Sequence, residues 1–112
     1  MVTWEEQIIN GLPPADKCLL ISICRNMTVS SSPWISLNQI KEEYDNIQTA
    51  TNIYPPWDRG RIQHQITTLN EFGYIQIRGN RPSTLRVTLN TGVLSCEAVE
   101  ACLVDTRTTK NE

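Results

Sequence analysis

The sequence predicts an α+β domain, with helices over most of its length and a β-hairpin near its end. As far as residue 72, apolar residues recur every three or four positions, which is typical of helices that bury one face. From residue 75 the period changes to two, as in strands with one buried face. A chain of 112 residues, 39% of them hydrophobic, predicts one globular domain over residues 1–104. The polar residues 105–112 are expected to form a flexible tail.

The first three predicted helices are separated by turn signals. A short helix over residues 3–10 is stopped by a glycine and two prolines. A second helix, apolar enough to be well buried, covers residues 15–27, and a very short strand at residues 34–35 follows a serine-rich turn. The third helix opens with the capping box of Ser36 and Gln39, in which each side chain bonds the other residue's backbone N–H.

A fourth helix is predicted over residues 58–72, after a proline-containing loop over residues 49–57. Asp58 is its expected N-cap, and Gly73 is its expected terminator. Its apolar residues recur at steps of four, three and three, which predicts one buried stripe: Ile62, Ile66, Leu69 and Phe72. The other face is polar.

After the fourth helix, two alternating segments predict a hairpin. Residues 79–83, which include a glycine and a proline, have the chemistry of its turn. A short C-terminal helix is predicted over residues 95–104. The residues on the apolar phase of their segments form the predicted core: Leu19, Leu20, Ile23, Leu37, Ile40, Tyr44, Ile62, Ile66, Leu69, Ile75, Ile77, Leu85, Val87 and Leu89.

Basic residues are concentrated in residues 58–88. This segment holds five arginines against Asp58 and Glu71, whereas the rest of the chain holds five basic and ten acidic residues. The net charge of −2 therefore hides a basic segment. Since the local sign of charge is what attracts a polyanion, the distribution favours nucleic acid although the overall charge does not.

Four cysteines leave two alternatives open. Small, buried, unpaired thiols are the first. The second is a disulfide that joins Cys18 or Cys24 to Cys96 or Cys102, which would be unusual in a cytosol unless the source is a hyperthermophile or its virus. Within each early or late pair the six-residue spacing is too long for a bridge on a helix, and it does not fit the usual zinc-ligand spacing.

The order helix, short strand, helix, proline loop, helix and hairpin resembles the winged-helix family of DNA-binding domains. The resemblance covers residues 15–90 and rests especially on RIQHQITTLNEFGYIQIRG followed by TLRVTL. It implies a three-helix helix-turn-helix core with a two- or three-stranded β wing, to which short N- and C-terminal helices are added. Length, cysteine content and element order also look like a small winged-helix protein of the spindle-shaped viruses that infect hyperthermophilic archaea.

The resemblance implies a recognition helix at residues 58–72 and a wing at residues 78–86. Arginine can bind guanine, glutamine can bind adenine, and threonine can contact base edges. Gly60, near the start of the helix, would let a phosphate approach the backbone closely. The helix candidates are Arg59, Gly60, Arg61, Gln63, His64, Thr67 and Thr68. The wing candidates for phosphate or minor-groove contacts are Arg78, Asn80, Arg81, Ser83 and Arg86. The acidic Glu71 predicts that the last turn of the helix points away from a duplex.

The expected function is that of a double-stranded DNA-binding protein, most simply a transcription regulator. The alternative is a winged helix that serves as a protein-interaction module in transcription or replication machinery. No nucleophile, metal-ligand or phosphate-loop motif is present, so neither an enzyme nor a cofactor, bound metal or small-molecule substrate is expected. The chain lacks the apolar run of a membrane span or signal peptide, which predicts an intracellular location, the host cytoplasm if the source is viral. A homodimer is left open.

Overall fold

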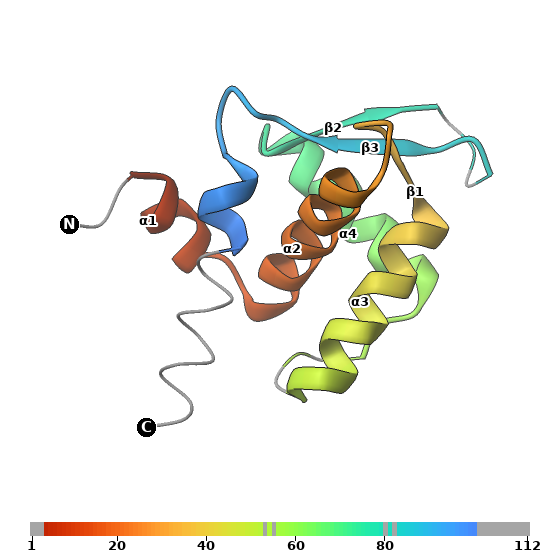
Figure 1. Ribbon diagram of the computed structural model, residues 1–112, viewed down its shortest axis with the longest axis horizontal. Helices are drawn as coiled ribbons and strands as arrows, with labels where there is room; N and C mark the ends of the chain where they lie inside the picture. The colour runs from red at the N-terminus through yellow and green to blue at the C-terminus, as the bar shows by residue number, and fades with distance from the viewer. Residues whose placement is uncertain (1–3, 53, 55, 80, 82, 101–112) are drawn as a thin grey trace.

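The computed structural model describes residues 4–52, 54, 56–79, 81 and 83–100. The elements, in chain order, are α1 (Trp4–Asn10), α2 (Pro14–Val29), β1 (Ile35–Ser36), α3 (Leu37–Thr51), α4 (Arg59–Glu71), β2 (Ile75–Arg78) and β3 (Arg86–Leu89). Residues 96–100 are also helical. The predicted α+β class is confirmed. Helices α2, α3 and α4 lie below the sheet in Figure 1, and the β2–β3 hairpin and α1 lie toward opposite ends of the longest axis.

The three strands form one antiparallel sheet with β3 in the centre. The strand order is β1-β3-β2, so the short β1 completes the hairpin as a third strand. Ile35 pairs with Val87, and Val87 pairs in turn with Ile77. Since residues in register point to the same face of a sheet, this row presents one apolar face to the helices.

The predicted core is confirmed almost completely. Thirteen of its members are buried, and Ile77 is partly buried and packs against the others. Further buried residues join the core from the ends of the described chain: Ile9, Leu94 and Val99. The helix over residues 96–100 therefore contributes to the same core as α2, beside which it lies in Figure 1.

Two predicted helix caps are present. At the start of α3 the Gln39 N–H donates to Ser36 Oγ, and the Ser36 N–H donates to Gln39 Oε1. At the start of α4 Asp58 Oδ1 accepts a 2.8 Å hydrogen bond from the Arg61 N–H. Both caps satisfy N–H groups that a helix leaves without partners in its first turn.

The boundaries differ from those predicted at several points. Helix α2 is longer at both ends, and α3 runs on to Thr51, where Asn52 ends it with a left-handed φ of 55°. The short strand begins one residue later than predicted, at Ile35. Thr3, residues 101–104 of the predicted C-terminal helix and the predicted tail 105–112 lie outside the described residues. Within the described ranges, every helix is too short or too polar to cross a membrane.

The prediction that Phe72 continues the buried stripe of α4 is wrong, because its side chain is 62% exposed. Helix α4 ends at Glu71, so Phe72 is already the C-cap, and Gly73 turns the chain with a φ of 84°. The Phe72 ring instead lies against that of Tyr74, with ring centroids 5.9 Å apart. The helix therefore ends at Glu71, whereas the helical spacing of apolar residues in the sequence continues to Phe72.

Asp16, in the first turn of α2, is a carboxyl group in the core. Its side chain is 3% exposed, and its Oδ1 has no hydrogen-bond partner among the described residues. Burial raises the pKa of Asp16 above its ordinary value of 3.8, and a hydrogen bond with Gln65 of α4 opposes this effect. The charged form of this carboxyl group therefore lowers the stability of the folded protein, because burial removes it from water.

We expect Asp16→Asn to raise the melting temperature at pH 7. A folded-state pKa above the unfolded value means that the stability linked to Asp16 is complete below about pH 3.8 and is lost as pH rises through the folded-state pKa. The amide removes the charge while keeping a group that can bond Gln65, so the gain should vanish at low pH. Thermal melts over a pH series measure it, with the exposed Glu42→Gln as the control. A variant less stable than the wild-type protein at pH 7 would contradict this account.

Candidate nucleic-acid interface

Helix α4 presents a polar face because its apolar stripe is fixed in the core. Ile62, Ile66 and Leu69 are completely buried, and α4 packs on α2, α3 and β2. The predicted helix candidates therefore lie on the sides turned away from the core: Arg59, Gly60, Arg61, His64 and Thr67 are exposed, and Gln63 and Thr68 are half-buried. The geometry leaves the side chains of this face accessible to a large partner.

The two threonines of this face are held by their own helix. Thr67 Oγ1 donates to the Gln63 carbonyl at 3.2 Å, and Thr68 Oγ1 donates to the His64 carbonyl at 3.4 Å. These bonds use the hydroxyl hydrogens and leave oxygen lone pairs and methyl groups for an outside contact. Each threonine can then accept a hydrogen bond from a base or contact a thymine methyl group.

At the start of α4, Arg61 is stacked on an aromatic pair. Its guanidinium carbon Cζ lies 4.9 Å from the centroid of the Trp57 ring. The Trp57 ring is nearly parallel to that of Tyr44, with an interplanar angle of 7° and a centroid distance of 6.0 Å. Since Tyr44 is completely buried in α3, this stack connects a surface arginine to the core.

A hollow of about 510 Å³ lies at the outer end of this stack and is lined by Pro56, Trp57, Asp58, Gly60, Arg61 and His64. It brings together three of the predicted helix candidates. A Cβ atom at Gly60 would meet only Asp58 Oδ1, at an ordinary 3.6 Å. The protein's own packing therefore does not require glycine there, and the predicted close approach of a phosphate remains a prediction.

In the hairpin, Arg78 of β2 lies directly opposite Arg86 of β3. Like charges in such a pair destabilise a sheet, but the two guanidiniums have different partners. Arg78 Cζ lies 4.5 Å from the centroid of the Trp34 ring. Arg86 Nη1 donates to the Leu85 carbonyl at 2.8 Å and to the Ser83 carbonyl at 3.5 Å. Two positive charges are thus kept on adjacent strands.

The turn of the hairpin depends on Gly79, whose φ is 87° and whose missing Cβ would lie 2.5 Å from the Thr84 carbonyl oxygen. Any other residue would force the turn apart. Arg81 and Ser83 are exposed beyond this point. Asn80, the remaining wing candidate, lies outside the described residues.

The ion-paired basic residues all lie outside residues 58–88, where Lys17 is the one described basic residue without an ion pair. The ion pairs of the described residues join Arg25 to Glu43 and Glu100, and Lys41 to Asp45. None of them includes an arginine of α4 or of the hairpin. The five arginines of residues 58–88 therefore keep charges that are not neutralised by a direct contact with a described carboxylate.

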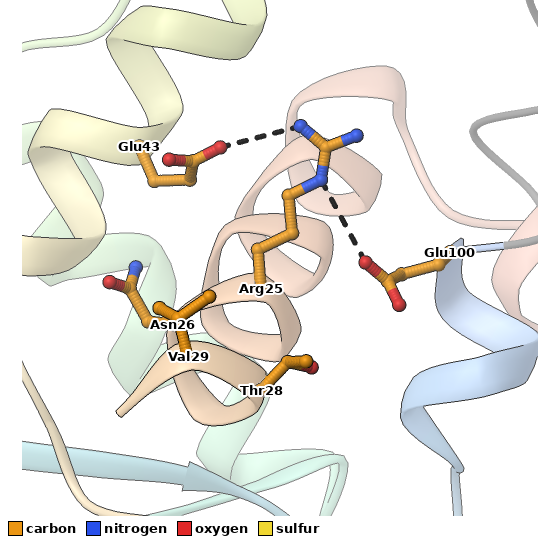
Figure 2. Close-up of a pocket in the computed structure, with 6 residues that line it drawn as sticks. All are labelled: Arg25, Asn26, Thr28, Val29, Glu43 and Glu100. Carbon is orange, nitrogen blue, oxygen red and sulfur yellow. Dashed lines mark hydrogen bonds and ion pairs between the residues drawn. The ribbon is translucent and has the colours of Figure 1, made fainter. Parts of the chain in front are cut away.

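A second hollow lies on α2, α3 and the helix over residues 96–100, and it has a different character. Figure 2 shows Arg25 between the carboxylates of Glu43 and Glu100, with Val29 beside them. The hollow measures about 250 Å³ and is lined by Arg25, Asn26, Thr28, Val29, Glu43 and Glu100. Its single arginine is compensated by two acidic groups, so the hollow does not attract a polyanion.

The described cysteines are free thiols, so the disulfide alternative is wrong for Cys18, Cys24 and Cys96. Cys24 forms a side-chain hydrogen bond with Cys96, and no bond joins the two sulfurs. Cys18 lies elsewhere in the core, where burial raises its pKa to about 12. Cys102 lies outside the described residues. The alternative of buried free thiols is confirmed for Cys18 and Cys24.

The Cys24–Cys96 contact makes the two thiols unequal. Their hydrogen bond, together with burial, raises the pKa of Cys24, which keeps its proton and donates it. The same bond lowers the pKa of Cys96 from an ordinary 9.0 to about 7. Cys96 is also less buried than Cys24. The described residues contain no cluster of three or more histidine, cysteine or acidic side chains that could bind a metal ion.

The comparison with known proteins gives a fold but no family. No protein-family model matches the chain, and no curated protein matches its sequence. The structure is similar to that of Cdc6p from Pyrobaculum aerophilum, with a TM-score of 0.76 and 22% identity over 94% of this chain and 26% of that one. It is also similar to Drosophila ORC bound to DNA, with a TM-score of 0.75 and 15% identity over 91% of this chain and 25% of that one.

The chain spans about a quarter of the length of each of these two structures. At such identities the similarity concerns the fold alone, and it supports a winged-helix fold. Neither structure is described as viral, so the narrower resemblance to proteins of spindle-shaped viruses stays a prediction. The resemblance drawn from residues 15–90 and the structural similarity agree at the level of the fold.

The sequence did not indicate the roles of Trp34 and Trp57. Trp57 packs against the core, and its ring also contacts the Tyr44 ring and the Arg61 guanidinium. Tryptophan immediately before the N-cap of a polar helix was the available signal. The contact of Trp34 with Arg78 joins residues far apart in the chain, and no local pattern could have revealed it.

We expect iodoacetamide to alkylate Cys96 before Cys24 and Cys18 in the folded, reduced protein. The thiolate is the reactive form, so the Cys96 rate should rise with pH to half its maximum near pH 7. Peptide mapping by mass spectrometry at several pH values measures each site. In Cys24→Ala the hydrogen bond is absent, and the midpoint for Cys96 should move up toward 9.0. An unchanged midpoint would show that Cys24 does not control the reactivity of Cys96.

Proposed function

We propose that the protein is a winged-helix protein that binds double-stranded DNA, with α4 as the recognition helix and the β2–β3 hairpin as the wing. One observation carries the proposal. The five arginines of these elements make no ion pair with a described residue, whereas two of the three described basic residues outside them, Arg25 and Lys41, are paired with carboxylates. Unneutralised arginines on a helix and an adjacent hairpin suit the phosphates and base edges of a duplex.

The comparison structures support the same proposal. One of them, Drosophila ORC, is a complex with DNA, and its similarity covers 91% of this chain. We propose that α4 enters the major groove, where Gln63, His64 and Thr67 contact base edges beside Arg61. The wing would contact the backbone or the minor groove. Binding, rather than catalysis, is the proposed activity, and a transcription regulator is its simplest biological form.

The second candidate is a protein-interaction module in transcription or replication machinery. Two exposed apolar side chains favour it: Val29 is 84% exposed and Phe72 is 62% exposed. Val29 is on α2, where it lines the second hollow together with Asn26 (Figure 2). The two candidate functions can be distinguished by removing arginines, because only DNA binding depends on the positive charges of the arginines in α4 and the hairpin.

We expect Arg81→Ala to weaken binding to every duplex alike. Arg81 is exposed at the hairpin turn. A side chain on a turn can extend far but is not held in one position, so we expect it to contact a phosphate rather than a base. Loss of one such contact should reduce the slope of log K against log salt by about 0.9. Fluorescence anisotropy at several salt concentrations measures the slope. Lys41→Ala removes a charge that pairs with Asp45 on α3, and it should leave binding unchanged.

We expect Gln63→Ala or Thr67→Ala to weaken binding to the preferred duplex alone. Loss of a base contact should cost about 1 to 3 kcal/mol on a site selected from a random DNA pool, with little effect on a scrambled duplex. The same titrations measure both affinities. If these variants bind both duplexes as the wild-type protein does, α4 does not read DNA, and the protein-interaction candidate becomes the better one.

A further inference from the structure

Three planar groups form a ladder from the core to the surface at the start of α4. Tyr44 is completely buried, Trp57 is half-buried, and Arg61 is exposed. The Tyr44 and Trp57 rings are nearly parallel, and the Arg61 guanidinium lies over the Trp57 ring. Because the innermost ring cannot move without disturbing the core, the ladder limits where the guanidinium can go.

The hairpin contains a second pair of the same kind. The Arg78 guanidinium lies over Trp34, which directly precedes β1, and β1 is paired with the central strand β3. The sheet therefore fixes the tryptophan, and the tryptophan holds the arginine. The two pairs differ in sequence and in secondary structure, but in both an exposed guanidinium rests on an indole ring that the fold holds in place.

The other arginines of the proposed interface behave differently. The guanidiniums of Arg59 and Arg81 make no hydrogen bond, ion pair or ring contact with any residue that the structure describes. Each is exposed. Such a side chain samples many rotamers and loses this freedom when it binds, whereas a stacked guanidinium has already lost part of it.

Stacking leaves the hydrogen-bonding capacity of the arginine available. An indole ring covers the face of the guanidinium, but the five N–H donors lie in its plane. The group can therefore still make a bidentate contact with guanine or a phosphate while the ring fixes its position. A guanidinium held in one position discriminates between bases better than a mobile one, because it cannot move to reach the differently placed acceptors of a wrong base.

We propose that Trp57 and Trp34 are positioning residues that hold the Arg61 and Arg78 guanidiniums in place before DNA binds. Arg61 and Arg78 then supply contacts at fixed positions, and Arg59 and Arg81 supply adaptable contacts with phosphates. The proposal rests on the proposed DNA-binding function. It assigns sequence preference to the arginines with an aromatic support, rather than to the basic residues of the interface as a whole.

The stack itself is tested on the free protein, without DNA. In ¹H–¹⁵N spectra the side-chain Hε resonance of Arg61 should be shifted upfield by the ring current of Trp57. The shift should disappear in Trp57→Leu and be largely kept in Trp57→Phe, which retains a ring. The Arg59 resonance serves as the internal control and should not move. An Arg61 resonance equal to that of Arg59 in the wild-type protein would overturn the proposal.

The functional role is tested by a double-mutant cycle on a selected duplex and a scrambled one. Trp57→Leu should reduce the preference for the selected duplex by about three- to tenfold, the range of an exposed to partly buried cation–π contact. It should not change the salt slope, because no charge is lost. In an Arg61→Ala background Trp57→Leu should have almost no further effect, since the supported group is absent.

The matched control is Arg59→Ala, the neighbouring arginine without a ring contact. In this background Trp57→Leu should have its full effect, because Arg61 is still present. Equal effects in the Arg61→Ala and Arg59→Ala backgrounds would show that Trp57 serves only stability and would overturn the proposal. Trp57→Phe, with its melting temperature measured, separates the ring contact from a folding defect, since it should restore most of the preference. A wild-type protein that binds neither duplex would overturn the proposed function itself, whatever the spectra show, whereas equal binding to both duplexes would overturn only the assigned sequence preference.

Discussion

Burial of one stripe of α4 is the constraint on which the rest of the interface depends. Ile62, Ile66 and Leu69 are completely buried against the surrounding helices and strand, and a rotation of α4 about its axis would expose them to water. Each large apolar side chain contributes about 1.5–3 kcal/mol when it is buried, so the rotation of the helix is strongly specified. Every polar side chain of α4 takes its direction from this choice, including the threonines that bond their own helix and the arginine that reaches Trp57.

Charge is distributed over the fold in a way that its net value conceals. On α2 and α3, two of the three basic side chains, Arg25 and Lys41, are paired with carboxylates, and Arg25 bridges two of them (Figure 2). On α4 and the hairpin three of the five guanidiniums meet an indole ring or backbone carbonyls instead. A carboxylate partner would neutralise a guanidinium and compete with phosphate, whereas a ring or a carbonyl orients it and leaves its charge in place. This difference in partners, more than the number of arginines, marks the proposed interface.

Helix α2 combines the centre of the core with several polar groups. Ser22 satisfies its hydroxyl by donating to the Cys18 carbonyl at 2.7 Å, and Cys24 donates to Cys96. Asp16 is the exception, because burial raises its pKa and one of its oxygens has no partner among the described residues. Its hydrogen bond with Gln65 joins α2 to the helix that carries the proposed interface. A buried carboxyl at this junction lowers stability, yet it provides a directional contact that apolar packing does not.

The spacing of apolar residues is enough to predict the helices, the strands of the hairpin and nearly all of the core. The two caps follow from the residue types at the helix starts. Each of these features depends on neighbours within a few positions of the sequence. Ile62, Ile66 and Leu69 could be placed from their spacing, and Asp58 from its position before them. Phe72 could not, since the sequence pattern continues for one residue after the helix has ended and only the turn at Gly73 decides where that ring points. The partner of Arg78, and the ring of Tyr44 that supports Trp57, were equally out of reach. Tyr44 lies in α3 and Trp57 in the loop before α4, and Trp34 precedes β1 whereas Arg78 ends β2. Only the packing of α3 beside α4, and of β1 and β2 on either side of β3, brings such residues within contact distance.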